Sequence, residues 1–140
     1  GVPQMLTEVQ SSYEQARRAL DAGDNDKTST LVQAALVTCS RIQERLPDSP
    51  EAKKADEWAA KLKPLARSAD NAAKVARIED QAQRRLAVIR NLARERETAS
   101  LERNSDTVET LTVLLRQNID KLIKEYPHTK AAKEAKDLRP

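Results

Sequence analysis

The sequence LPDSPEA at residues 46–52 lies between two stretches of helical periodicity. Pro47 ends the helix that precedes it, because proline has no N–H with which to continue the helical hydrogen bonds. Ser49 can cap the next helix, Pro50 suits its first position, and Glu51 suits the positive end of its dipole. The stretch therefore predicts a turn between two helices, the second of which begins near Pro50.

Apolar residues recur at helical spacing on both sides of this turn, so we expect helices throughout the chain. A first helix should end at Gly23 and a second at Leu46. Lys63-Pro64 predicts a break or kink in the third. Beyond it, neither Pro nor Gly interrupts residues 68–101, which predicts one long central helix. The apolar side of this helix is predicted to contain Val75, Ile78, Ala82, Leu86, Ile89 and Ala93.

The last part of the chain shows the same signals. A turn is predicted at residues 102–105, and Asp106 with Glu109 forms a capping pair for the helix that follows. That helix should end at Pro127, and Thr129 should cap a last short helix. Aromatic residues make up 2% of the chain and Phe is absent, so the core must consist of Ala, Leu, Val and Ile. We therefore predict an all-α fold of antiparallel helical hairpins with one long central helix.

The chain matches itself when it is shifted by 80 positions without gaps. Of residues 1–60, 9 are identical to their counterparts in residues 81–140, and the matches fall at caps, helix breakers and core positions. They include Leu6 and Leu86, Asp26 and Asp106, Leu31 and Leu111, Pro47 and Pro127, and Ala55 and Ala135. This pattern predicts a repeated helical unit. The first repeat would cover about residues 4–66 and the second about 70–139, within a single domain over 1–140.

The residues at the first two turns resemble those of a tetratricopeptide-type helix–turn–helix. The resemblance rests on residues 46–52, on the similar stretch YPHTKAA at 126–132, and on Ala16, Leu20, Gly23, Asp24 and Ala35. The Tyr-Pro style of the second stretch is similar to repeats in bacterial cell-envelope proteins. The resemblance covers roughly residues 6–62 and 86–138.

This resemblance implies a TPR-like α-solenoid that binds another protein or a peptide along a groove, without catalysis. The helices at residues 4–22 and 70–101 would line that groove. The resemblance also favours a periplasmic or envelope-associated location, if a leader precedes Gly1. The sequence itself identifies neither the partner nor the compartment.

The residues that usually carry chemistry are few and scattered. His128, the one histidine, lies in a predicted turn, and a solvent-exposed position is expected for it. Cys39, the one cysteine, lies in an apolar stretch and is expected to be buried. One His and one Cys cannot form a usual zinc site or a catalytic triad, so we predict no metal, no cofactor and no enzymatic activity. No apolar run approaches 18 residues, which predicts no transmembrane segment.

Basic residues concentrate in the middle of a chain whose formal net charge is +3. Residues 61–103 hold 11 basic and 6 acidic side chains. We expect an acidic partner protein to contact the arginines of the long helix, namely Arg77, Arg84, Arg85, Arg90 and Arg94. A nucleic acid could follow the same charges, but no aromatic residue lies nearby to stack on bases. The long helix could instead pair with its twin, which would make the chain a dimeric helical spacer.

Overall fold

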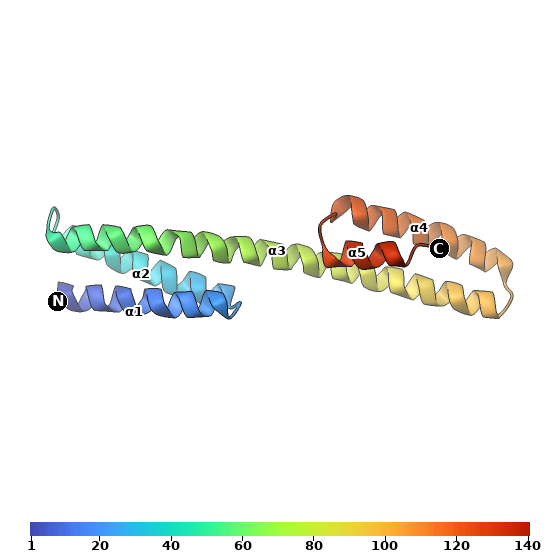
Figure 1. Ribbon diagram of the computed structural model, residues 1–140, viewed down its shortest axis with the longest axis horizontal. Helices are drawn as coiled ribbons and strands as arrows, with labels where there is room; N and C mark the ends of the chain where they lie inside the picture. Colours follow the sequence, from blue (N-terminus) through green and yellow to red (C-terminus); the bar gives the residue numbers. More distant parts are fainter. The chain divides into compact units, whose positions relative to one another are not determined.

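The computed structural model describes residues 1–140 and consists of α-helices joined by short turns (Figure 1). The helices are α1 (Val2–Asp21), α2 (Asn25–Arg45), α3 (Pro50–Leu101), α4 (Ser105–Glu125) and α5 (Lys130–Asp137). The predicted all-α class and the long central helix are confirmed. The chain forms two compact units, Gly1–Lys74 (unit 1) and Val75–Pro140 (unit 2), and each is described by itself.

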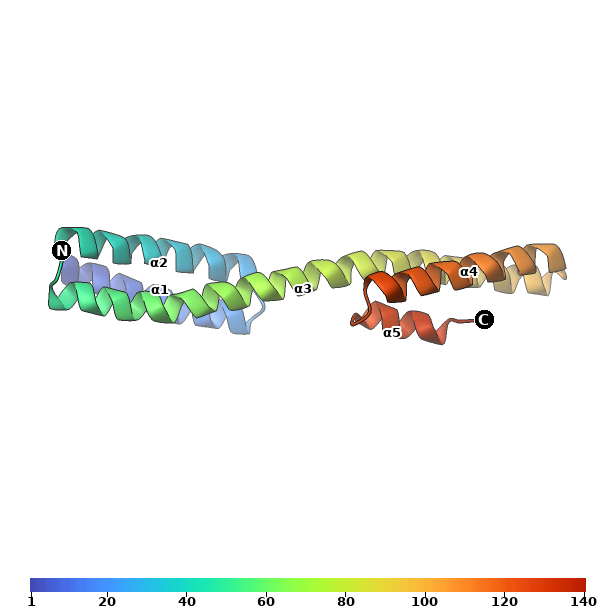
Figure 2. The ribbon, with the colours of Figure 1, turned by 90° about the horizontal axis from the view of Figure 1, so that it is seen from above.

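Unit 1 contains three helices that lie side by side, namely α1, α2 and the N-terminal part of α3 (Figure 2). Its core is built from small and aliphatic residues of all three: Val9, Ala16, Val32, Ala35, Cys39, Ile42, Ala55 and Leu62. Tyr13 and Trp58 close one side of this core, with their ring centroids 5.3 Å apart. Cys39 is 2% exposed, which confirms the prediction that it is buried.

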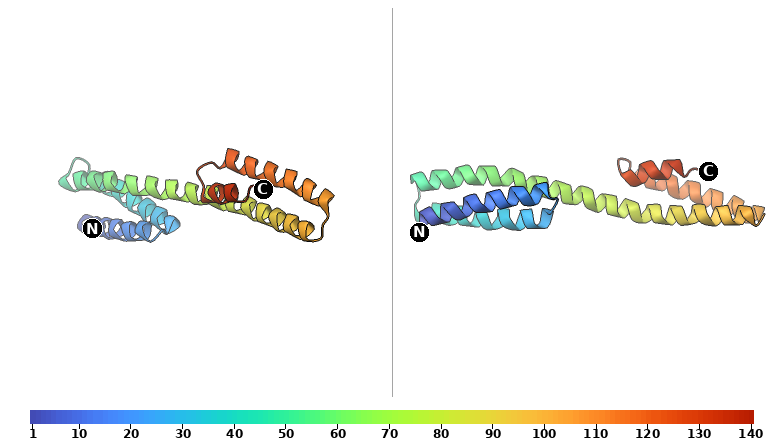
Figure 3. Two further views of the ribbon diagram at one scale, coloured as in Figure 1. Left: turned by 45° about the vertical axis from the view of Figure 1, so that its right-hand side comes forward. Right: turned by 60° about the horizontal axis from the view of Figure 1, so that its bottom comes forward.

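Unit 2 combines the C-terminal part of α3 with α4 and α5 (Figure 3). Its core is formed by Ala82, Leu86, Ile89, Leu115, Ile119, Leu122, Ala131 and Ala135. Alanine supplies all of the fully buried residues of α5, so this short helix lies close to its neighbours. The half-buried Leu138 packs against the edge of the core just beyond α5.

The first turn of each unit is built in the same way, at positions 80 residues apart. Before α2, the side chain of Asp24 accepts a hydrogen bond from the backbone N–H of Lys27 at 3.1 Å. Before α4, the side chain of Asn104 accepts one from the N–H of Thr107 at 3.3 Å. These side chains satisfy N–H groups that have no partner within the helix.

The second turn of each unit shows the same correspondence. Ser49 Oγ accepts a hydrogen bond from the N–H of Ala52 at 3.0 Å. Thr129 Oγ1 accepts one from the N–H of Ala132 at 3.1 Å, which confirms the predicted cap of the last helix. Helix α2 starts at Asn25 and α4 at Ser105, and their ends likewise differ by 80 positions.

Two local predictions are wrong, namely the break at Lys63-Pro64 and the capping pair at Asp106 and Glu109. Helix α3 shows no break at Lys63-Pro64 and continues through Pro64, which faces solvent. The fully buried Leu62 and Ala69 anchor the helix on both sides of that residue, and this packing outweighs the lost backbone hydrogen bond. The capping pair at Asp106 and Glu109 does not form, because α4 begins earlier and Asn104 is its N-cap.

Candidate functional site

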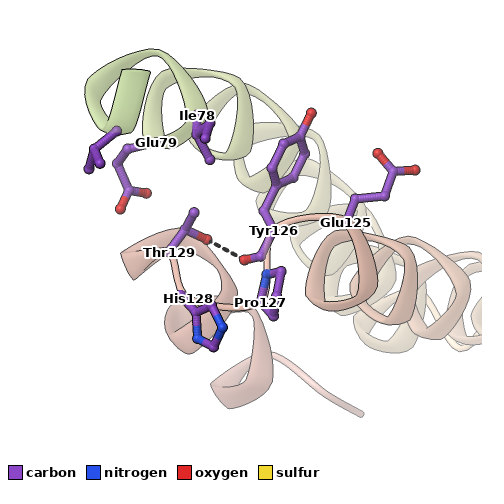
Figure 4. A pocket seen from close by; sticks show the side chains of 8 residues that line it. Ile78, Glu79, Glu125, Tyr126, Pro127, His128 and Thr129 are labelled. Atoms are coloured by element: carbon purple, nitrogen blue, oxygen red, sulfur yellow. Dashed lines mark hydrogen bonds between the residues drawn. The ribbon is translucent and has the colours of Figure 1, made fainter. Parts of the chain in front are cut away.

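An apolar pocket of about 300 Å³ lies in unit 2, between α3 and the turn that joins α4 to α5. Figure 4 shows side chains of α3 on one side of it and those of the turn on the other. Its lining residues are Val75, Ile78, Glu79, Glu125, Tyr126, Pro127, His128 and Thr129. We call this the turn pocket.

The turn that forms one wall of the pocket is fixed by hydrogen bonds at both ends. The N–H of Tyr126 donates to the carbonyl of Leu122 at 2.9 Å and so closes α4. The Thr129 hydroxyl donates to the carbonyl of Tyr126 at 2.8 Å while it caps α5 (Figure 4). Thr129 is buried, and its hydroxyl both donates and accepts a hydrogen bond. This wall of the pocket is therefore formed in advance of any binding event.

Glu79 joins the opposite wall to α5. Its carboxylate oxygens accept hydrogen bonds from the backbone N–H groups of Lys130 at 2.7 Å and Ala131 at 3.2 Å. Desolvation by burial raises the pKa of Glu79, but the hydrogen bonds from Lys130, Ala131 and Gln83 and the positive charge of Lys130 together lower it by more. The net pKa therefore lies below the ordinary value of 4.5. The carboxylate stabilises the N-terminus of α5 from a position about 50 residues away in sequence.

Tyr126 carries the aromatic surface of the pocket and is held by an arginine. The guanidinium of Arg85 lies 5.2 Å from the centroid of the Tyr126 ring. The same guanidinium forms an ion pair with Glu125, with 2.5 Å between Nη1 and Oε2. The Arg85 guanidinium therefore lies close to both the ring and the carboxylate, and it compensates the negative charge of Glu125 at the pocket rim.

The apolar side of the pocket is open to solvent. Val75 is 66% exposed and Ile78 is 45% exposed, although both belong to the stripe that the sequence predicts to be the apolar side of α3. Ala82, Leu86 and Ile89, further along the same stripe, are buried in the core of unit 2. The helical periodicity thus continues past the point where unit 2 covers it, which leaves an aliphatic surface beside the pocket.

The five arginines predicted to bind a partner do not form one patch. Arg85 pairs with Glu125, and Arg90 pairs with Glu134 at 2.7 Å between Nη2 and Oε2. Arg94 donates a hydrogen bond to Asn91 on its own helix. Arg77 and Arg84 are exposed and seven residues apart, so they lie on one side of α3. Two of the five are thus engaged with other helices of their own unit.

The pocket residues were only half anticipated by the sequence. The range 70–101, expected to line a groove, includes the residues of α3 that form one wall. The other wall, at residues 125–129, was predicted as a turn and as part of the stretch that resembles tetratricopeptide repeats, but not as a binding surface. His128 is exposed, as predicted, and lies at the rim of the pocket. The signal that could have identified this wall is Tyr126, one of the few aromatic residues, placed directly before a proline.

The residues that line the pocket favour an apolar ligand group. The carboxylates at its edge are engaged, Glu79 by backbone N–H groups and Glu125 by Arg85. No group of three or more His, Cys, Asp or Glu residues in the chain is placed to hold a metal ion. None of the helices combines the length and the hydropathy that crossing a membrane requires.

Neither a protein-family model, nor a curated protein sequence, nor a solved structure matches this chain.

Proposed function

We propose that the chain is a non-enzymatic protein-interaction module that binds an aliphatic or aromatic side chain of another protein in the turn pocket. The observation that carries the proposal is the exposure of Val75 and Ile78 beside a preformed apolar pocket. Isolated exposed apolar residues are ordinary on a protein surface, but two of them at the edge of a concave apolar site form a binding surface. Buried apolar anchors of this kind supply most of the energy of protein interfaces.

We further propose that the two units are copies of one TPR-like helical unit. The support lies in the paired turns: Asp24 and Asn104 cap their helices alike, and so do Ser49 and Thr129. Repeated helical units that present turns and grooves to other proteins fit the interaction role better than a catalytic one. A location in the bacterial envelope stays a prediction that rests on the residues at 126–132.

Selection of peptides from a displayed random library against the full chain tests the interaction. We expect selected peptides to share an aliphatic or aromatic anchor and to lose at least tenfold in affinity for the variant Val75→Ser/Ile78→Ser. Val88→Ser is the matched control, because Val88 is on the same helix, is 52% exposed and lies outside the pocket. Selected peptides that bind the pocket variant as well as the parent chain would refute the proposal.

The same exposed residues support one alternative. Val75 and Ile78 lie on α3, so two copies of the chain could cover them by pairing along this helix. Light scattering at several concentrations separates the two functions. A dimer that becomes a monomer of 15.6 kDa in the Val75→Ser/Ile78→Ser variant would establish the helical spacer and exclude the free pocket. Nucleic-acid binding, the third possibility, requires an affinity that falls steeply with salt.

A further inference from the structure

One stretch of α3 has no buried residue to hold it. Ala69 and Ala82 are both 0% exposed, and no residue between them is buried. No other two successive buried residues of α3 lie this far apart. All of residues 70–78, which we call the exposed segment, are exposed except the half-buried Ala73. Side-chain packing therefore contributes little to the helical conformation of this segment.

Polar contacts to other helices are absent from the exposed segment as well. No hydrogen bond or ion pair joins a side chain of residues 70–78 to another helix. Such contacts begin directly after it, where Glu79 accepts hydrogen bonds from the start of α5. Two residues further on, Gln81 accepts one from the Tyr126 hydroxyl at 3.4 Å. The segment thus lies between a buried residue, Ala69, and a hydrogen-bonded one, Glu79.

The helix in the exposed segment depends on backbone hydrogen bonds and on intrinsic propensity. Its alanines favour the helix, whereas Asp70, Asn71 and Val75 favour it less. An isolated helix shorter than about 12 residues is marginal in water. A stretch that makes few buried contacts opens at a smaller free-energy cost than global unfolding requires. Apart from its ends, α3 should therefore open first at residues 70–78.

The exposed segment also carries part of the turn pocket. Val75 and Ile78 line the pocket from α3, and both belong to the segment. Figure 4 shows Ile78 and Glu79 on α3, across from the side chains of the turn. The turn has its own hydrogen bonds at Tyr126 and Thr129, so it does not depend on the segment. Opening of the segment would remove one wall of the pocket and leave the other in place.

We propose that the exposed segment opens locally as a minor state of the folded chain, and that a ligand in the turn pocket suppresses this opening. The ligand contacts Val75 and Ile78 only while the segment is helical, so binding favours the helical state. The second half of this inference rests on the proposed function. The first half, the local opening, does not depend on it.

Hydrogen exchange of the free chain tests the opening. Amides of residues 70–78 should be protected at least about tenfold less than those of residues 86–89, which lie beside the buried Leu86 and Ile89. Protection equal to that of residues 86–89 would overturn the proposal, because the segment would then open only together with the core of unit 2.

A matched pair of substitutions tests whether helix propensity controls the opening. Ala76→Gly, at an exposed position outside the pocket lining, should speed exchange of the exposed segment about two- to fivefold. Ala87→Gly makes the same change at another exposed position of α3, beside the buried Leu86. It should leave exchange of residues 70–78 unchanged. Equal acceleration of these residues by both variants would contradict a local opening.

A peptide selected for binding to the turn pocket tests the coupling. At a free concentration ten times its Kd, exchange of residues 70–78 should slow about tenfold, while exchange in α1 should not change. Unchanged exchange of the segment with the pocket occupied would refute the coupling and leave the proposed function intact. If no selected peptide depends on Val75 and Ile78, the proposed function and the coupling both fail. The local opening is then still decided by the exchange of the free chain.

Discussion

Gly23 and Arg103 lie 80 residues apart and occupy the same place in their turns, each with a left-handed backbone, at φ +79° and +57°. In both turns the following residue, Asp24 or Asn104, donates its N–H to a carbonyl five residues earlier, at 2.9 Å. Glycine adopts this conformation freely, whereas a residue with a Cβ does so at a cost of about 1 kcal/mol. Unit 1 thus has the favourable residue at this turn and unit 2 does not.

Replacement of Arg103 by Gly should raise the free energy of unfolding by roughly 0.5–1 kcal/mol, because relief of backbone strain exceeds the entropy that Gly adds to the unfolded chain. Urea unfolding followed by circular dichroism measures it. Glu102→Gly is the control and should lower stability, since residue 102 does not have positive φ. Equal effects of the two changes would contradict the account.

The reciprocal change, Gly23→Ala, should lower stability by about 1 kcal/mol. A Cβ built at Gly23 meets no atom within 4 Å, so the expected cost comes from the backbone alone. Thermal unfolding of the variant and of Ala22→Gly, its neighbour with an ordinary helical φ, checks this.

The substitution Glu79→Gln should loosen α5, because a neutral amide accepts hydrogen bonds from Lys130 and Ala131 more weakly than a carboxylate. Hydrogen exchange of these two amides should accelerate at pH 7. The pKa of Glu79 is lowered in the folded state, so its stabilisation is present above the ordinary value of 4.5 and is lost as pH falls through the lower folded pKa.

The difference between the parent chain and Glu79→Gln should therefore shrink below pH 4.5 and disappear in stronger acid. Asp80→Asn, an adjacent and exposed carboxylate, should leave exchange at α5 unchanged. A difference that persists at low pH would show that the charge of Glu79 is not what holds α5.

Pro64→Ala should stabilise unit 1 by roughly 1–3 kcal/mol, since proline in a helix interior removes one backbone hydrogen bond and strains the preceding turn. The exposed position means that no packing is lost. The midpoint of urea unfolding should rise, and a fall would indicate that α3 depends on a bend at this residue.

Ile42 and Leu122 are both 0% exposed and lie 80 residues apart. Replacement of either by Ala should cost about 2–5 kcal/mol through lost burial and the cavity that remains. The control Val37→Ala, at a site 51% exposed, should change the free energy of unfolding by less than about 0.5 kcal/mol. A small effect at only one of the two core sites would show that the units are packed differently.

The local part of the fold could be predicted from the sequence, because its causes are local. Ser49 and Thr129 predict where helices start, because their side chains form short-range hydrogen bonds, and both caps form as expected. The break predicted at Pro64 is wrong, because a buried residue on each side of it keeps α3 helical. The strength of this packing depends on helices far away in sequence.

The turn pocket could not be predicted for the same reason. The periodic stripe makes Val75 look equivalent to Leu86, and only the position of the neighbouring helices decides which of the two is buried. The hydrogen bonds of Glu79 to the start of α5 span about 50 residues and have no signature in local sequence. Turns can therefore be predicted from the sequence, whereas the position at which a helix stops being buried by its neighbours cannot.

The buried thiol of Cys39 is an intrinsic probe of local opening in unit 1. Desolvation by burial and the charge of Asp56 raise its pKa, so both access and reactivity depend on opening of the surrounding helices. Unit 2 has no cysteine, and its counterpart position is Ile119. The rate at which a thiol reagent modifies the native chain therefore reports how often unit 1 alone opens, without any engineered label.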